Sequence, residues 1–281
     1  RLYQALYRKW RPQTFADVIG QQHITDTLRA QLQSGRLSHA YLFTGTRGTG
    51  KTTCAKILAR AVNCEHPVNG DPCNECAACR GILDGSVLDV TEIDAASNNG
   101  VDNIRDLRDE TRYTPAQVRK RVFIIDEVHM LSIGAFNALL KTLEEPPEHV
   151  LFILATTELH KVPATILSRC QRFDFRRIGA EDISRRLLDV AAGEGIALTE
   201  GAARLIARLA DGAMRDALSM LDRAAAAGAV DEKTVTAALG VMGQDDGIRL
   251  AEHLKTGNLA AAVGLLDEYY NAGRDLASVY D

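Results

Sequence analysis

Gly45 to Thr52 form a segment whose residue types suit a loop that wraps phosphate groups. It reads GTRGTGKT and matches the pattern G-x4-G-K-[ST] at every position. In such a loop the glycines let backbone N–H groups curl around phosphate oxygens, and the helix that begins there adds positive potential. Lys51 can reach the β- and γ-phosphates, and the Thr52 hydroxyl can bind Mg²⁺. The predicted nucleotide contacts are Gly45, Thr46, Arg47, Gly48, Thr49, Gly50, Lys51, Thr52 and Thr53.

Two adjacent carboxylates, Asp126 and Glu127, follow a short apolar run. The run, VFII over 122–125, is typical of a strand buried on both faces. A carboxylate where such a strand ends, beside the phosphate loop, can hold Mg²⁺ through water, and we assign this role to Asp126. Glu127 can polarise the water that attacks the γ-phosphate. We assign no catalytic role to His129, because a histidine at this place more often begins a helix.

Three further side chains could complete a hydrolytic site. The apolar run VLFILAT over 150–156 predicts a strand parallel to the Asp-Glu strand, and Thr157 after it is our candidate for contact with the γ-phosphate. The alternative for Thr157 is an ordinary turn at the end of a strand. Arg169, within Ser-Arg-Cys, is either a solvated charge or an arginine finger. Arg215 begins a predicted helix, from which it could swing over the phosphates.

Four of the six cysteines lie close together in the sequence, at Cys64, Cys73, Cys76 and Cys79. Their spacing, C-x8-C-x2-C-x2-C, matches structural zinc sites in which four thiolates form a tetrahedron. An iron–sulfur cluster uses similar spacings, and free cysteines on a loop are the third alternative. We favour zinc, because nothing nearby indicates redox chemistry and the loop has little core of its own without a metal.

The elements that must position these residues alternate between strands and helices. Strands are predicted at 40–43, 87–94, 122–125, 150–156 and 171–175. Amphipathic helices are predicted at 22–33, directly after the phosphate loop and around 136–143, and a polar helix is predicted at 102–113. This alternation predicts an α/β fold, in which a parallel sheet is covered by helices on both sides.

We divide the chain into three parts. Residues 1–178 are expected to form the α/β nucleotide-binding domain, with the cysteine insert at 64–79. Residues 179–242 contain only Ala/Leu-rich segments and predict a small domain of three to four helices. The helical stretch 243–281 has apolar faces with too few partners to close a core, so we expect the sequence to end inside this third domain.

Composition excludes several classes of protein. The apolar fraction of 46% and the charged fraction of 25% exclude a disordered chain, a collagen and a coiled-coil rod. No stretch approaches the roughly 18 apolar residues of a membrane span, and no secretory signal is visible. The net charge of −4 argues against nucleic-acid binding by general positive charge, so any such site would be a local patch.

Taken together, the motifs resemble the gamma/tau family of bacterial DNA polymerase III clamp-loader subunits, which are AAA-plus P-loop ATPases. The resembling segments cover most of residues 3–225 and include YRKWRPQTFADVIGQ, HAYLFTGTRGTGKTT, EIDAASNNGVDNIRDLRD, FIIDEVHMLS, FNALLKTLEEPPEHVLFILATTE, ILSRCQRF and GAMRDALSMLD. The Ser-Arg-Cys signature together with the four-cysteine insert is highly specific to this family. No motif position departs from the family pattern.

The resemblance implies a function and a set of partners. Family members use ATP, Mg²⁺ and Zn²⁺ and work in a five-subunit ring, where copies of this subunit assemble with delta and delta-prime subunits. ATP binding lets the ring open the sliding clamp, and primed DNA triggers hydrolysis and release. The ring belongs to the DNA polymerase III holoenzyme, a DNA-directed DNA polymerase (a nucleotidyltransferase), and the location is the bacterial cytoplasm at the nucleoid.

The resemblance also implies roles for individual residues. Arg169 serves the ATP of the neighbouring subunit, residues 179–242 form the lid, and residues 243–281 begin the collar that holds the ring together. The adenine-side wall is implied to contain Tyr7, Arg11, Pro12, Val18 and Ile19. Arg105 and Lys141 are expected to contact the DNA backbone; the alternative is that both are solvated helix charges.

Three rival functions remain open. A different AAA-plus motor, such as a branch-migration helicase, would share the phosphate loop, the Asp-Glu pair and the lid, but is not expected to carry the four-cysteine insert. A module whose nucleotide is only structural is disfavoured by the intact catalytic motifs. A zinc-dependent DNA-binding protein is disfavoured because the insert holds few basic residues.

Overall fold

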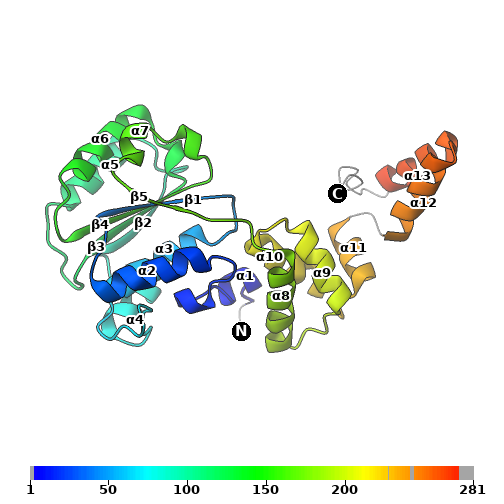
Figure 1. The fold of residues 1–281 in the computed structure, drawn as a ribbon, viewed down its shortest axis with the longest axis horizontal. Helices are drawn as coiled ribbons and strands as arrows, with labels where there is room; N and C mark the ends of the chain where they lie inside the picture. The colour runs from blue at the N-terminus through cyan, green and yellow to red at the C-terminus, as the bar shows by residue number, and fades with distance from the viewer. Residues whose placement is uncertain (1–2, 227, 241–243, 272–281) are drawn as a thin grey trace. The chain divides into compact units, whose positions relative to one another are not determined.

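The computed structural model of the chain describes residues 3–226, 228–240 and 244–271. Contacts divide the chain into two compact units, which are residues 11–177 and residues 1–10 together with 178–281 (Figure 1). Within the described ranges, no helix combines the length and the apolar character needed to span a bilayer.

The larger unit, residues 11–177, is built on a five-stranded sheet. Its strands are β1 (Ala40–Thr44), β2 (Val90–Asp94), β3 (Arg121–Asp126), β4 (Val150–Thr156) and β5 (Gln171–Asp174). They lie in the order β2-β3-β4-β1-β5, and every neighbouring pair is parallel. The predicted parallel sheet is therefore confirmed, although β2 begins three residues later than the alternating pattern suggested.

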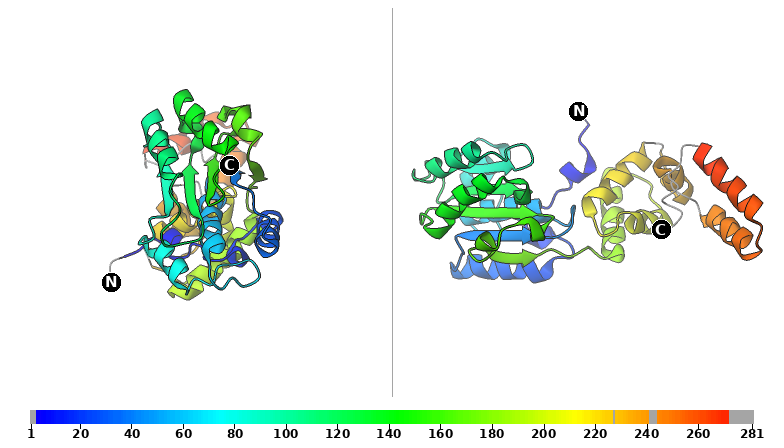
Figure 2. Two further views of the ribbon diagram at one scale, coloured as in Figure 1. Left: turned by 90° about the vertical axis from the view of Figure 1, so that its left-hand side faces the viewer. Right: turned by 90° about the horizontal axis from the view of Figure 1, so that it is seen from above.

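Helices cover both faces of this sheet (Figures 1 and 2). One face carries α2 (Gln22–Ser34) and α3 (Lys51–Asn63), and the other carries α5 (Val101–Glu110), α6 (Ile133–Glu144) and α7 (Ala164–Leu167). Successive side chains of a strand point to opposite faces. In β1, Tyr41 and Phe43 therefore pack with α2 and α3, whereas Leu42 packs with α5 and α6. A further helix, α4 (Ala77–Asp84), lies in the cysteine insert.

The strand order places three functional segments side by side. The phosphate loop follows β1. Asp126 is the last residue of β3 and is followed by Glu127, and Thr157 follows β4. These three strands are neighbours in the sheet, in the order β3-β4-β1. Their carboxyl ends therefore share one edge, which is where ligands bind in open α/β sheets.

The second unit contains a cluster of four helices, as expected from the Ala/Leu-rich sequence. They are α8 (Ala180–Glu194), α9 (Glu200–Leu209), α10 (Met214–Ala225) and α11 (Glu232–Leu239). The core between them contains mainly Ala, Ile, Leu and Val side chains.

The N-terminal helix α1 (Leu6–Lys9) packs against this cluster. The Leu6 N–H donates to the Asp222 carboxylate at 2.8 Å, and the Trp10 indole N–H donates to Glu194 at 2.7 Å. The Trp10 ring lies so close to Gly193 that a Cβ there would approach it to 2.5 Å. Residues 3–10 fall within the part of the sequence that is predicted to form the nucleotide-binding domain. Their contacts instead group them with α8 and α10, and a four-residue helix has no periodicity from which this could be predicted.

The last described elements are α12 (Gln244–Lys255) and α13 (Leu259–Asn271). They pack through Leu250, Ala262 and Leu265, while Leu254 and Val263 are exposed. The remainder of the predicted third domain, at residues 243 and 272–281, lies outside the described residues, as do residues 241–242 of the predicted lid domain. The three-domain division stays a prediction.

Candidate active site

The phosphate loop depends on backbone conformations that glycine adopts readily. Gly45 has a φ of +142° and Gly50 a φ of +108°, both rarely adopted by residues with a side chain. Space is also restricted at Gly45, where a Cβ would lie 2.4 Å from the carbonyl oxygen of Phe175. Two of the glycines in the motif are therefore required by the geometry of the loop.

The ammonium group of Lys51 lies inside this loop. Lys51 is 5% exposed, and its Nζ donates to the carbonyl oxygens of Gly45 and Thr46, each at 2.8 Å. Burial lowers the pKa of Lys51, while the negative charges of Glu127 and Asp126 act in the opposite direction. The loop thus holds a cation where the motif predicts the β- and γ-phosphates.

Thr52 and Asp126, the two predicted Mg²⁺ ligands, are in direct contact. The Thr52 hydroxyl donates to Asp126 Oδ2 at 2.7 Å. The other carboxylate oxygen, Oδ1, accepts the backbone N–H of Glu127 at 2.9 Å. Hydroxyl and carboxylate oxygens are the ligands that Mg²⁺ prefers, so this pair fits the ion.

Glu127 and Thr157 are also brought together. The Thr157 hydroxyl donates to Glu127 Oε2 at 2.9 Å, and the Thr157 backbone N–H donates to the same oxygen at 3.3 Å. Glu127 has a left-handed backbone conformation, with φ +48°, that is uncommon for a residue with a side chain. The contact of Thr157 with a γ-phosphate stays a prediction, but its contact with the proposed base is observed.

Gln21 is a supporting residue that the sequence did not indicate. Its side chain is fully buried, and Nε2 donates to the carbonyl oxygens of Thr49 and Arg176 at 3.2 and 2.7 Å. Oε1 accepts the Arg176 backbone N–H at 3.1 Å. Gln21 therefore joins the phosphate loop to the segment after β5. A glutamine next to the start of a helix gives no sequence signal for such a role.

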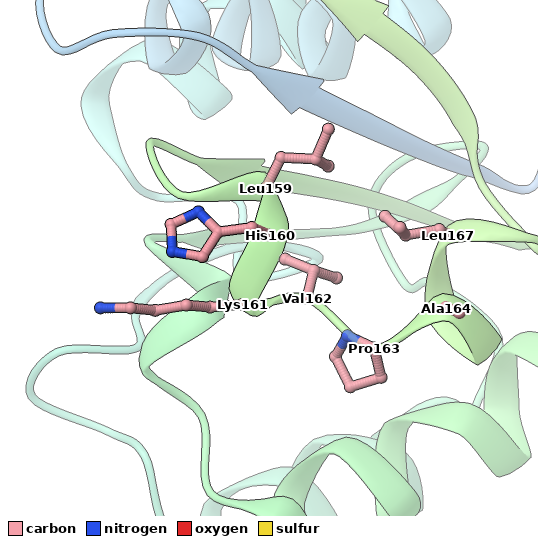
Figure 3. Close-up of a pocket in the computed structure, with 7 residues that line it drawn as sticks. All are labelled: Leu159, His160, Lys161, Val162, Pro163, Ala164 and Leu167. Atoms are coloured by element: carbon pink, nitrogen blue, oxygen red, sulfur yellow. The ribbon is translucent and has the colours of Figure 1, made fainter.

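Arg169 lies just after α7 and is held by its own chain. Nη2 pairs with Glu144 Oε1 at 2.8 Å, and Nη1 donates to the Thr165 carbonyl oxygen at 2.8 Å. The side chain is about one-third exposed. Residues 159–164 and Leu167, which precede Arg169 in the sequence, line a shallow, largely apolar hollow (Figure 3). The predicted role of Arg169 at a neighbouring subunit is untested.

Arg215 and Tyr7 are paired within the helical unit. The guanidinium carbon of Arg215 lies 4.8 Å from the centroid of the Tyr7 ring, which is cation–π geometry. A hydrogen bond from Arg8 and the nearby Arg215 lower the pKa of Tyr7. Tyr7 is predicted to lie in the adenine-side wall and Arg215 to contact the phosphates, and both roles stay predictions.

The other adenine-wall candidates belong to the larger unit. Val18 is buried in the core beside Phe15, whereas Arg11, Pro12 and Ile19 are half-buried. The adenine contacts of these four residues stay predictions.

The four clustered cysteines converge in space. Their sulfur atoms all lie within 4.8 Å of one another, a set that could hold a metal ion. Backbone N–H groups of Cys73, Cys76 and Cys79 donate to the sulfur atoms of Cys64, Cys73 and Cys76 at 3.3–3.4 Å. Hydrogen bonds, chiefly from the Glu75 backbone, lower the pKa of Cys73 to about 6, whereas burial raises the pKa of Cys79. A zinc ion would hold all four cysteines as thiolates, and four sulfur donors at this spacing suit a tetrahedral zinc site.

Arg105 and Lys141 lie on α5 and α6, two helices that pack together. Arg105 pairs with Asp102 at 2.9 Å, three residues earlier on the same helix. This arrangement fits the solvated-charge alternative as well as DNA contact, so the DNA role stays a prediction.

Family models match two consecutive segments of the chain. The model described as "DNA polymerase III, delta subunit" matches residues 20–179, and "DNA polymerase III clamp loader subunit, ATPase lid domain" matches residues 182–230.

Three curated relatives show the extent of the similarity. DNA polymerase III subunit tau of Bacillus subtilis is 56% identical over 281 residues, which are 99% of this chain and 50% of the relative. The Escherichia coli subunit tau is 49% identical over 268 residues, covering 95% of this chain and 42% of the relative. The Buchnera aphidicola subunit gamma is 48% identical over 242 residues, covering 85% and 67%. The chain thus spans about half the length or less of the tau relatives.

Solved structures support the fold. The Thermotoga maritima RuvB Holliday junction branch migration motor matches with a TM-score of 0.63 over 91% of this chain and 85% of that chain. A mutant of the same motor gives a TM-score of 0.64 over 91% of this chain and 86% of that chain. Both are 17% identical in sequence to this chain, and at this identity the likeness concerns the fold alone.

The geometry at the strand ends, the cysteine cluster and the sequence relatives all indicate the same protein family. The first family model alone matches more than half of the chain, and the second follows it directly. The chain therefore belongs to the gamma/tau family of DNA polymerase III clamp-loader subunits.

Proposed function

We propose that this chain is the ATP-hydrolysing motor of a bacterial clamp loader. ATP binding and hydrolysis would drive opening of the sliding clamp and its placement on primed DNA. The observation that carries the proposal is the convergence of the phosphate loop, the Asp126-Glu127 pair and Thr157 at one edge of the sheet. The chemistry assigned to the chain is hydrolysis, and polymerisation is assigned to other parts of the holoenzyme.

Nucleotide binding would depend on charge and on the conformation of the loop. The buried ammonium of Lys51 now donates to two backbone carbonyl oxygens. When ATP binds, negatively charged phosphate oxygens would replace these carbonyls as its acceptors. Thr52 and Asp126 would hold Mg²⁺, which when bound neutralises phosphate charge. Gln21 keeps the loop attached to the strand-end segment while this occurs.

Turnover would depend on Glu127. A water oxygen attacks the γ-phosphorus, its proton passes to the Glu127 carboxylate, and the bond to the β–γ bridging oxygen breaks to release ADP. Thr157 contributes by holding Oε2 of Glu127 from the adjacent strand end.

Arg169 would act on the ATP of a neighbouring copy. It lies just after α7, and its described partners are Glu144 and nearby groups of its own segment. Once the pair with Glu144 opens, Arg169 is therefore available to another subunit. An exposed pair of this kind contributes little stability, on the order of 0–1 kcal/mol. The negative charge on a transferring phosphoryl group is a stronger partner.

The remaining parts of the proposal concern assembly. We propose that copies of the chain join delta and delta-prime subunits in a five-subunit ring in the cytoplasm, at the nucleoid. The zinc module stabilises residues 64–79 and has no catalytic part. Arg105 and Lys141 would follow the DNA backbone by shape without reading bases.

Branch migration is the second candidate function, favoured only by the similarity in fold to RuvB. The cysteine cluster and the clamp-loader family models favour clamp loading. The test is the ATPase rate of the full-length protein, assembled with its partner subunits, with and without clamp and primed DNA. Clamp loading predicts the highest rate when both are present. An assembled complex that responds to four-way junction DNA, and not to clamp with primed DNA, would contradict it.

A further inference from the structure

His129 is a buried imidazole with a carboxylate at each ring nitrogen. It lies in the short helix η2 (Val128–Met130), and its side chain is 5% exposed. Nδ1 lies 3.3 Å from Glu127 Oε2, and Nε2 lies 3.1 Å from Glu158 Oε2. Nδ1 is also 3.0 Å from the Thr156 hydroxyl. The Thr156 hydroxyl is the hydrogen-bond partner of the ring, and the two carboxylates lie at ion-pair distance from its nitrogens.

Glu127 is held through a single carboxylate oxygen. Its contacts with Thr157 and with His129 all involve Oε2. Among the described residues, no hydrogen bond to Oε1 is found. One oxygen is therefore fixed from two sides, while the other remains available to a water molecule. A general base needs such a fixed direction, because proton transfer requires hydrogen-bond geometry.

Glu158 contacts His129 at Nε2, the ring nitrogen that does not face Glu127. Its backbone N–H donates to the Thr156 hydroxyl at 3.0 Å, and its carboxylate pairs with Lys161 at 2.7 Å. The hydrogen bond from Lys161 lowers the pKa of Glu158, so this carboxylate is charged at neutral pH. Lys161 belongs to η3 (Leu159–Lys161), where it and His160 extend to the same side of the segment (Figure 3). Contacts therefore link Glu127 to His129, His129 to Glu158, and Glu158 to Lys161.

We propose that His129 is the positioning residue of the hydrolytic base: it holds Glu127 Oε2 against Thr157 so that Oε1 faces the attacking water. This inference rests on the proposed ATPase function. His129 itself touches neither nucleotide nor water in this role. The arrangement is that of a base oriented by a second group, which is in turn oriented by a third.

The two ring nitrogens can be tested separately. An asparagine amide takes the place of Nδ1, so His129→Asn keeps a donor for Glu127 and loses the contact with Glu158. A glutamine amide reaches the place of Nε2, so His129→Gln keeps Glu158 and loses Glu127. Misplacing a catalytic group by about 1 Å can cost on the order of 100-fold in rate. We therefore expect kcat to fall roughly 10- to 100-fold in His129→Gln and His129→Ala, and much less in His129→Asn.

The measurement is ATPase turnover and ATP affinity of the full-length protein assembled with its partner subunits. ATP affinity should change less than about threefold in every His129 variant, because Lys51 and Thr52 are untouched. His160→Gln is the matched control: His160 is an exposed histidine of η3, two residues after Glu158, and should retain wild-type turnover. Thermal unfolding of each variant shows that the fold is intact.

Two results would overturn the proposal. One is wild-type turnover in both His129→Gln and His129→Ala. The other is an equal loss in His129→Asn and His129→Gln with normal ATP affinity, because the loss would then not follow the contact with Glu127. Glu127→Gln separates this outcome from failure of the proposed function. If Glu127→Gln keeps full turnover, the base lies elsewhere and His129 cannot be its positioning residue, whereas absence of ATPase activity in the wild-type assembly would mean that the proposed function itself is wrong.

Discussion

At the scale of single residues, the site is a set of charged groups held by short hydrogen bonds. Lys51 is buried against two carbonyl oxygens, Asp126 accepts from Thr52, and Glu127 accepts from Thr157. The residue types and their spacing predict these groups, and the structure brings them together, while their roles in catalysis stay predictions. The partners that hold them were harder to predict. Gln21 and Glu158 end two of the segments that resemble the family, but their residue types indicate no role, and only the fold brings Gln21 to the phosphate loop and Glu158 to His129.

Lys51→Ala should weaken ATP binding at least roughly 100-fold. The ammonium makes charge-assisted hydrogen bonds to phosphate, each contributing about 1.5–3 kcal/mol, and no other described ammonium lies in the loop. Isothermal titration calorimetry measures the effect. Lys56→Ala is the control, since Lys56 lies on the same helix but pairs with Glu92. Unchanged affinity in Lys51→Ala would contradict the assignment of the loop.

At the scale of elements, the alternation of apolar runs predicted the parallel sheet because strands buried on both faces need nearly continuous apolar residues. The details at strand starts were not predictable. Asp89 accepts the backbone N–H groups of Ala116 and Gln117 and pairs with Arg121 at 2.7 Å. Within VLDVTEID, which also contains Asp94, nothing in the sequence indicates that Asp89 joins β2, β3 and the intervening loop.

Asp89→Asn should lower the free energy of unfolding by about 2 kcal/mol at pH 7, the usual cost of weakening a buried charged hydrogen-bond network. Burial alone would raise the pKa of Asp89, but the N–H groups of Gln117 and Ala116 and the Arg121 side chain lower it by more. A carboxyl with a lowered pKa stabilises the fold above its unfolded pKa of about 3.9 and loses this contribution as the pH falls.

The difference between Asp89→Asn and wild type should therefore be largest at pH 7 and shrink toward pH 3. Urea unfolding followed by circular dichroism at both pH values is the measurement. A difference that stays constant, or grows on acidification, would show that Asp89 does not stabilise the fold through its charge.

The cysteine insert should hold one zinc ion per chain, measured by elemental analysis of purified protein. Cys79→Ser should remove the ion and increase hydrogen exchange over residues 64–82, because the insert has only a small core around the sulfur atoms. ATP affinity should change little. Cys170→Ser should keep the zinc: Cys170 lies outside the cluster, and burial raises its pKa to about 12. Iron in place of zinc would favour the iron–sulfur alternative.

At the scale of the whole molecule, the described chain consists of a nucleotide-binding unit and a helical unit that also contains residues 3–10. The helical structure after residue 179 could be predicted from the Ala/Leu-rich composition of that part of the sequence. The packing of α1 on α10 was not, because it joins segments about 200 residues apart through a few specific contacts such as Leu6 with Asp222. The chain therefore passes between the two units twice, at residues 10–11 and again at residues 177–178.

Arg169 should act between molecules, so neither Arg169→Ala nor Lys51→Ala rings should hydrolyse ATP well. An arginine finger contributes roughly 10³–10⁵ in rate. Arg169→Ala should still bind ATP. Mixed in ring-forming full-length protein, the two variants should recover part of the lost activity, because some interfaces combine an intact pocket with an intact finger. Activity no higher than the sum of the separate variants, with co-assembly demonstrated, would mean that Arg169 works within its own chain or only holds the interface.

The central claim is that Glu127 is the base of an ATP-hydrolysing site, and the most direct test is Glu127→Gln in the full-length, assembled protein. The amide preserves shape but cannot take a proton from water. If Glu127 is the base, ATP affinity should stay close to wild type, turnover should fall at least about 100-fold, and ATP-bound protein should accumulate, as measured by extracting and quantifying the bound nucleotide. Wild-type turnover, with ADP as the main bound nucleotide, would contradict it.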